Sequence, residues 1–123
     1  MPRIALVADD DTHSLFFMES VLQPTGMQVL VAEDGLKALE ILQRLTPDVV
    51  FIDLLMPRLS GLDVIGYIME TRRLQDVAVV IVTAHDRSQF MHYPQLTRAD
   101  AYLLKPVRTQ DIRDIAQQVA GGS

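Results

Sequence analysis

Short apolar runs alternate along the chain with segments whose apolar residues have helical spacing. Five such runs occur, at residues 4–8, about 27–32, 49–52, 77–82 and 101–104. Unbroken runs of this length, rich in Val and Ile, are typical of strands buried on both faces of a parallel sheet. Right-handed crossovers place helices on both faces of such a sheet, so the pattern predicts an α/β fold of five strands and five helices. We expect residues 1–123 to form one domain of this doubly wound type.

Two of the helical segments have clear signals of their own. The segment opened by Gly35 has an apolar stripe at i, i+3, i+4 and i+7, made of Ala38, Ile41, Leu42 and Leu45. Ser60 and Asp63 have the spacing of a capping box, which predicts that a third helix starts there. The residues of this third helix expected to face inward are Leu62, Ile65 and Met69.

The first and last helices are predicted from apolar spacing and from the breakers that follow. In the first helix the spaced residues are Leu15, Met18 and Leu22, and Pro24-Thr25-Gly26 ends the pattern. The last helix begins near Thr109, stops at Gly121-Gly122 and has an apolar face of Ile112, Ile115, Ala116 and Val119.

The fourth helix is expected between His85 and Thr97 and is predicted to be irregular. Pro94 breaks an interior turn, and the residues around Phe90 show no amphipathic period. We interpret Phe90, Met91 and Tyr93 as core packing in a distorted segment. The alternative is an exposed apolar patch that binds a partner.

Composition and charge exclude several classes of function. The chain has no cysteine, which rules out disulfides and thiolate metal sites. No segment approaches the roughly 20 apolar residues of a membrane span, and the N-terminus lacks a signal-peptide pattern, so we expect a cytoplasmic protein. The net charge is −5 and the basic residues are scattered, which argues against nucleic-acid binding by this domain.

Polar residues follow four of the five predicted strands. Asp9 and Asp10 follow the first, Asp53 the third and Lys105 the fifth, and Thr83 ends the fourth. The carboxyl ends of parallel strands meet at one edge, where α/β folds bind ligands.

Carboxylates about 4 Å apart repel by several kcal/mol, so this cluster requires a cation or a proton. Its oxygen ligands suit Mg²⁺ better than a Ca²⁺ cage, and the lysine and threonine suit phosphoryl oxygens. The set predicts phosphoryl transfer onto a carboxylate, with Asp53 as the nucleophile.

In this order and spacing the sequence resembles a receiver domain of a bacterial two-component response regulator. The resemblance spans essentially the whole chain. The motifs that carry it are Val7-Ala8-Asp9-Asp10-Asp11, Pro47 to Pro57 with Gly61, Val80 to Ala84 and Asp100 to Pro106. The resemblance implies a flavodoxin-like architecture with the strand order 2-1-3-4-5.

For the chemistry, the resemblance implies that Asp53 accepts a phosphoryl group from a histidine kinase or a phosphotransfer protein. Mg²⁺ would be held by Asp10, Asp53 and the backbone carbonyl of Leu55, with Asp9 acting largely through water. Lys105 would pair with the phosphoryl group. The domain would assist its own phosphorylation and dephosphorylation and would not act on an external metabolite.

For signalling, the resemblance implies that Thr83 moves toward the phosphoryl group and that Tyr102 rotates inward behind it. This would change the face formed by the fourth helix, fifth strand and fifth helix, where a homodimer or an effector would bind. His85, two residues after Thr83, can overhang the phosphoryl site with Leu55 and so tune the lifetime of the phosphoaspartate.

Several alternatives accompany these interpretations. Asp9, Asp10 and Asp11 can be helix-capping acids, and we favour that role for Asp11 alone. Tyr102 can be a core aromatic residue with a surface hydroxyl. A haloacid dehalogenase-type hydrolase also uses a strand-end Asp, but Leu55 stands where its second acid is usual. A receiver-like interaction module that works without phosphorylation is the remaining alternative.

Overall fold

The five strands form one parallel sheet in the order β2-β1-β3-β4-β5, as predicted. The computed structural model describes residues 2–121. The strands are β1 (Ile4–Ala8), β2 (Gln28–Ala32), β3 (Val49–Ile52), β4 (Ala78–Thr83) and β5 (Ala101–Leu104). Apart from β5 and the outer strand β2, the strand residues are almost entirely buried, which explains why the runs are apolar without alternation.

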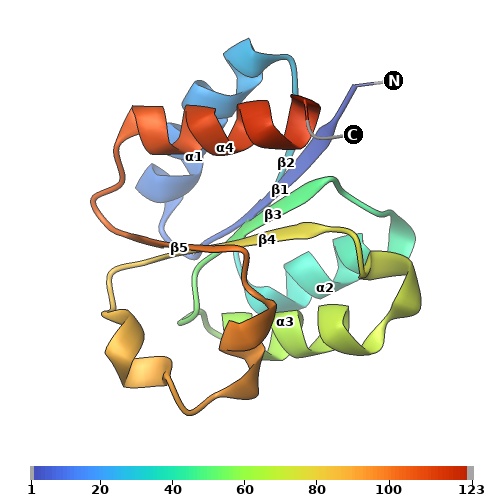
Figure 1. Cartoon of the computed structure of the whole chain (residues 1–123), viewed down its shortest axis with the longest axis vertical. Coiled ribbons are helices and arrows are strands. Elements are labelled where there is room, and N and C mark those ends of the chain that lie inside the picture. Colours follow the sequence, from blue (N-terminus) through green and yellow to red (C-terminus); the bar gives the residue numbers. More distant parts are fainter. Residues whose placement is uncertain (1, 122–123) are drawn as a thin grey trace.

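Helices cover both faces of the sheet, two on each (Figure 1). They are α1 (Thr12–Leu22), α2 (Gly35–Arg44), α3 (Gly61–Glu70) and α4 (Thr109–Gly121). Helices α1 and α4 lie on one face and α2 and α3 on the other (Figure 1). The predicted fifth helix is therefore α4, and Gly122, part of its predicted stop, lies outside the described residues. No helix in residues 2–121 has the length and apolarity needed to cross a membrane.

The helix starts are fixed by side chains that the sequence marks. The Asp11 carboxylate accepts a hydrogen bond from the backbone N–H of His13, which confirms Asp11 as the N-cap of α1. The predicted capping box of α3 is present, with reciprocal bonds between Ser60 and Asp63. These bonds satisfy N–H groups that have no partner within the helix.

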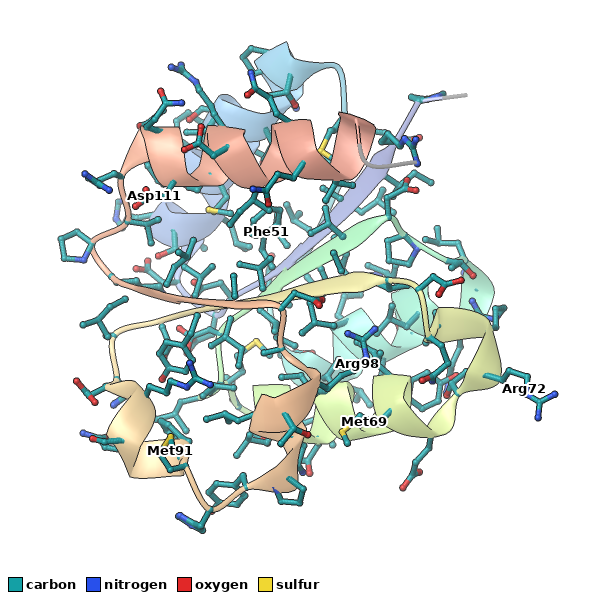
Figure 2. All side chains as sticks on the ribbon, in the orientation of Figure 1. Phe51, Met69, Arg72, Met91, Arg98 and Asp111 are labelled. Carbon is teal, nitrogen blue, oxygen red and sulfur yellow. The ribbon has the colours of Figure 1, made fainter. Side chains whose placement is uncertain are left out.

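The sheet separates two apolar layers, because successive strand residues point to opposite faces. In β3, Val50 and Ile52 pack toward α2 and α3, whereas Val49 and Phe51 pack toward α1 and α4. Figure 2 shows Phe51 between α4 and the sheet. One expected core residue is misplaced: Met69 of α3 is exposed, because it lies outside the stripe that Ile65 and Ile68 bury.

The prediction of a fourth α-helix is wrong. Two short 3₁₀ segments, η3 (Arg87–Phe90) and η4 (Pro94–Arg98), take its place, alongside α3 (Figure 1). Pro94 opens η4, where its missing N–H costs nothing, but it prevents one continuous helix. Two further 3₁₀ turns, η1 (Gln23–Thr25) and η2 (Arg72–Leu74), follow α1 and α3.

The side chains of this segment divide between core and solvent. Phe90 and Leu96 are buried in the layer shared with α2 and α3. Met91 and Tyr93 are exposed, and Figure 2 shows Met91 on the outer side of η3. The interpretation as core packing therefore holds for Phe90 and is wrong for the other two. Arg98, the last residue of η4, donates to carbonyl oxygens of the chain between α3 and β4.

Candidate functional site

Two buried acids extend neighbouring strands at the carboxyl edge of the sheet. The backbone N–H of Asp53 donates to the carbonyl of Ala8, and that of Asp9 donates to Ala32, both at 3.0 Å. The hydrogen-bond ladder thus continues one residue past β1 and β3 and fixes both backbones. Asp9 is only 4% exposed and Asp53 8%. Buried carboxylates of this kind need a charged or hydrogen-bonded partner.

Lys105, directly after β5, provides that partner. Its Nζ lies 2.6 Å from Asp9 Oδ2 and 3.0 Å from Asp53 Oδ2. Burial alone would lower the pKa of Lys105, but its hydrogen bonds to the two carboxylates outweigh that effect and raise it. Burial raises the pKa of Asp9, and Lys105 offsets the effect only in part. The ammonium group thus holds together acids that the sequence places 44 residues apart.

Asp10 completes the acidic cluster on the solvent side. It is exposed, and one carboxylate oxygen from each of Asp9, Asp10 and Asp53 lies within 4.8 Å of the others. Three carboxylates face one ammonium group, so the cluster keeps an excess of negative charge. Oxygen ligands with this charge fit a hard divalent cation such as Mg²⁺. Leu55 is beside it, with its backbone N–H 3.3 Å from Asp53 Oδ1.

Thr83 ends β4 in full burial with an unsatisfied hydroxyl. Its side chain is 0% exposed, and its Oγ1 has no hydrogen-bond partner among the described residues. A buried polar group without a partner costs about 1–3 kcal/mol. The Thr83 carbonyl accepts the backbone N–H of Lys105 at 2.8 Å, so β4 positions the lysine. The free hydroxyl and the ammonium group therefore belong to one strand pair.

Tyr102 and His85 form a contact beside Thr83. The Tyr102 hydroxyl donates to the backbone carbonyl of His85 at 2.6 Å. Burial, followed by the nearby Asp86 carboxylate, raises the pKa of Tyr102. The His85 ring is half-buried and meets Phe90 edge to face, with centroids 6.2 Å apart. Tyr102 thus joins β5 to the start of the segment that replaces the expected helix.

Two positioning features have weak sequence signals. The backbone N–H of Asp11 donates to Asp9 Oδ1 at 3.0 Å, and the Asp-x-Asp spacing could have indicated this turn. A Cβ at Gly61 would lie 2.1 Å from the carbonyl oxygen of Asp53, so only glycine permits the return of the chain at α3. Arg58, in the loop between Asp53 and Gly61, has a positive φ of 71°. This is a left-handed backbone conformation that no local motif predicts.

The predicted site residues therefore fall into a group that lies together at the acids and a group that lies apart from them. The structure brings together Asp9, Asp10, Asp53 and Lys105, and it places Thr83 on the strand that positions Lys105. Leu55 borders the cluster with an exposed side chain. Tyr102 and His85 contact each other, and no contact in the described structure joins them to the acids.

Comparisons with known proteins agree with this arrangement. A family model described as the response regulator receiver domain matches residues 5–117. The chain is 30% identical to Protein PilH of Pseudomonas aeruginosa, over 99% of this chain and all of that protein. It is 33% identical to the response regulator MprA of a Mycobacterium species over 91% of this chain, but spans only about half, 48%, of that longer protein.

A solved structure shows the same fold. The receiver domain of a sensor histidine kinase from Pseudomonas aeruginosa superposes with a TM-score of 0.88 at 21% identity, over 98% of this chain and 99% of that one. That domain holds a magnesium ion coordinated in its active site cleft.

Proposed function

Because the chain belongs to the response regulator receiver domain family, we propose that it is a phosphorylation-controlled switch with Asp53 as phosphoacceptor. The observation that carries the proposal is the buried Asp53 carboxylate with the Lys105 ammonium group 3.0 Å away. The donor would be a phosphohistidine of a histidine kinase or phosphotransfer protein in the cytoplasm. The haloacid dehalogenase alternative lacks support, since Leu55 occupies the position of its second acid.

The transfer follows from the groups around Asp53. A carboxylate oxygen of Asp53 attacks phosphorus, an O–P bond forms, and the P–N bond breaks with its electron pair leaving on the histidine nitrogen. Lys105 neutralises charge on the transferred group, because its ammonium group already faces Asp53. The ladder that fixes the Asp53 backbone limits the orientations in which the carboxylate can attack.

A divalent ion is part of the proposal. Asp9, Asp10, Asp53 and the backbone carbonyl of Leu55 would hold Mg²⁺, in accord with the close carboxylate oxygens. The ion would supply positive charge for the phosphoryl oxygens. Charge balance supports this assignment, because the phosphoryl group adds negative charge to a cluster in which one lysine faces three acids.

Thr83 and Tyr102 would transmit the change. The unpartnered Thr83 hydroxyl is a donor for a phosphoryl oxygen, and its movement would alter the space available to Tyr102. Any loss of the bond from Tyr102 to the His85 carbonyl would release the start of the η3–η4 segment. The surface of η3, η4, β5 and α4 would then serve an effector or a second copy.

The test is phosphorylation of the full chain by acetyl phosphate, followed by intact mass measurement. We expect a phosphoryl adduct that requires Mg²⁺ and is absent in Asp53→Asn. The substitution preserves size and removes only the charge, so it serves as the matched control. The proposal fails if neither acetyl phosphate nor a kinase partner gives an adduct and the protein does not bind Mg²⁺. The interaction module that works without phosphorylation would then replace it.

A further inference from the structure

A cavity of about 450 Å³ lies beneath the first turns of α1, next to the loop that joins β5 to α4. Its floor is the sheet, with Phe51 of β3 and Val82 of β4. Ser14 and Phe17 of α1 line one wall and Val107 of the loop lines the opposite wall. The cavity is open to solvent on one side, and most of the side chains that line it are apolar.

One wall of the cavity carries a short side chain, Ser14. Helix α1 packs on the sheet through Leu15, Met18 and Leu22, all of which are buried. Ser14 has no bulk to fill the space beside them, and its hydroxyl turns away to donate to Asp11 Oδ2 at 3.2 Å. The wall at Ser14 therefore carries less side-chain bulk than the neighbouring positions of Leu15 and Met18.

The cavity adjoins the acid site but is distinct from it. Asp9 and Lys105 line its inner end, whereas Asp10, Asp53 and Thr83 do not line it. The two charged lining residues already neutralise each other across 2.6 Å. The cavity thus offers a ligand mainly apolar walls, with the Asp9–Lys105 ion pair at one end. His13 of α1 also lines the cavity and offers a hydrogen-bonding group.

We propose that this cavity binds a small uncharged aromatic molecule, of bicyclic size, with one hydrogen-bonding group. Its volume falls in the range of about 300–1,000 Å³ typical of small-ligand sites. The rings of Phe17 and Phe51 in its lining offer edge and face contacts to an aromatic ligand. The site is independent of the proposed phosphorylation, since its ligand needs neither Asp53 nor a metal.

Ligand binding would reach the acid site through a shared residue. The ligand would touch the Lys105 side chain, and Pro106 and Val107 that follow it. Any preference of the ligand for one position of Lys105 would alter metal or phosphoryl binding, and the reverse effect would be equal in size. The cavity is thus a site from which a small molecule can tune the response of the domain.

The test uses indole as the probe with the ¹⁵N-labelled full chain, followed by NMR. We expect saturable shifts at the amides of Val82 and Val107, with a dissociation constant on the order of 1 mM or tighter. Ser14→Leu places a branched side chain at the wall and should weaken binding by about tenfold or more. Ser20→Leu is the matched control: it makes the same change on exposed Ser20 of α1, outside the cavity, and should bind as wild type does.

Three results would overturn the inference. The first is no saturable shift at the cavity amides. The second is equal indole binding by wild type and the filled variant, with Val107→Phe as the filled variant if Ser14→Leu does not fold. The third is indole binding by the Phe17→Ala variant but not by wild type, which would show that the Phe17 ring itself occupies the space in the wild-type protein.

Discussion

Arg98 provides the sharpest test of how the segment between β4 and β5 is held. Its Nη2 donates to the carbonyl of Val77 at 2.6 Å and to that of Gln75 at 3.1 Å, with a longer contact of 3.4 Å to Leu74. Its Nη1 lies 3.3 Å from the Asp100 carboxylate. Figure 2 shows Arg98 beside the sheet, above α3. Replacement by Met keeps most of the aliphatic stem and removes every one of these bonds.

The loss of stability in Arg98→Met depends on which carbonyl and carboxylate acceptors lose their donor. Val77 is buried, so its carbonyl has poor access to replacement water, and losing a charged donor there costs about 1.5–3 kcal/mol. Gln75 is exposed and its carbonyl can be hydrated, so it adds little. The Asp100 side chain is 56% exposed, which limits that ion pair to about 0–1 kcal/mol. Arg98→Met should therefore lower the free energy of unfolding by about 2–3 kcal/mol.

The assay is urea unfolding followed by circular dichroism, with Arg72→Met as the control. Arg72 is an exposed arginine that Figure 2 shows pointing away from the fold, and its loss should change stability by less than about 0.5 kcal/mol. The backbone N–H of Asp100 donates to the carbonyl of Val79. Hydrogen exchange at this amide should be faster in Arg98→Met than in wild type, and unchanged in Arg72→Met. If both arginine variants have the same stability, the guanidinium group does not hold the segment.

Three further predictions concern glycine, pH and the site rim. Gly66→Ala should stabilise the protein by about 0.5–1 kcal/mol, because its Cβ would meet only Gln95 at 3.9 Å. Gly61→Ala should destabilise it by more than about 2 kcal/mol because of the clash at 2.1 Å, and equal melting temperatures would contradict this contrast. Lys105 has a folded-state pKa raised above its ordinary 10.5, so the stability that its charge contributes is present below pH 10.5 and is lost as pH rises through the folded value. In metal-free buffer the stability difference between wild type and Lys105→Met should therefore shrink above that pH, and a difference that grows would refute the linkage. His85→Ala should change the dephosphorylation rate of the phosphorylated domain, and a rate equal to wild type would remove His85 from any role in the phosphoaspartate lifetime.

The sequence predicts the strands β1, β3 and β4 well, because each is a continuous apolar run that fits a strand buried on both faces of the sheet. Val49 to Ile52 are apolar at every position, and Asp53 is the first residue that the core cannot hold. The acids meet because parallel strands end at one edge, and that rule requires no knowledge of side-chain contacts.

The remainder depends on contacts that local sequence does not encode. Arg98 bonds carbonyls 21 to 24 residues away, so nothing within residues 86–98 indicates how that segment is held. Met69 was assigned to the core from spacing alone, although the buried stripe passes it by. The cavity is lined by residues of α1, of β1, β3 and β4, and of the chain after β5, and a serine in a helix gives no sign of a space formed by such distant segments.

The ladder that fixes Asp9 and Asp53 separates the reactive part of the domain from the part that others would recognise. Asp9 is held by the pairing of β1 with β2 and Asp53 by the pairing of β3 with β1, whereas η3 and η4 lie between β4 and β5 in the chain and η4 contacts α3. Exchanges of exposed side chains in this segment, such as Met91 and Tyr93, consequently leave the acids in place. During evolution the exposed residues of this segment can therefore change to fit a new binding partner while the phosphoacceptor site is unchanged. Partner specificity and phosphorylation chemistry can then diverge at different rates.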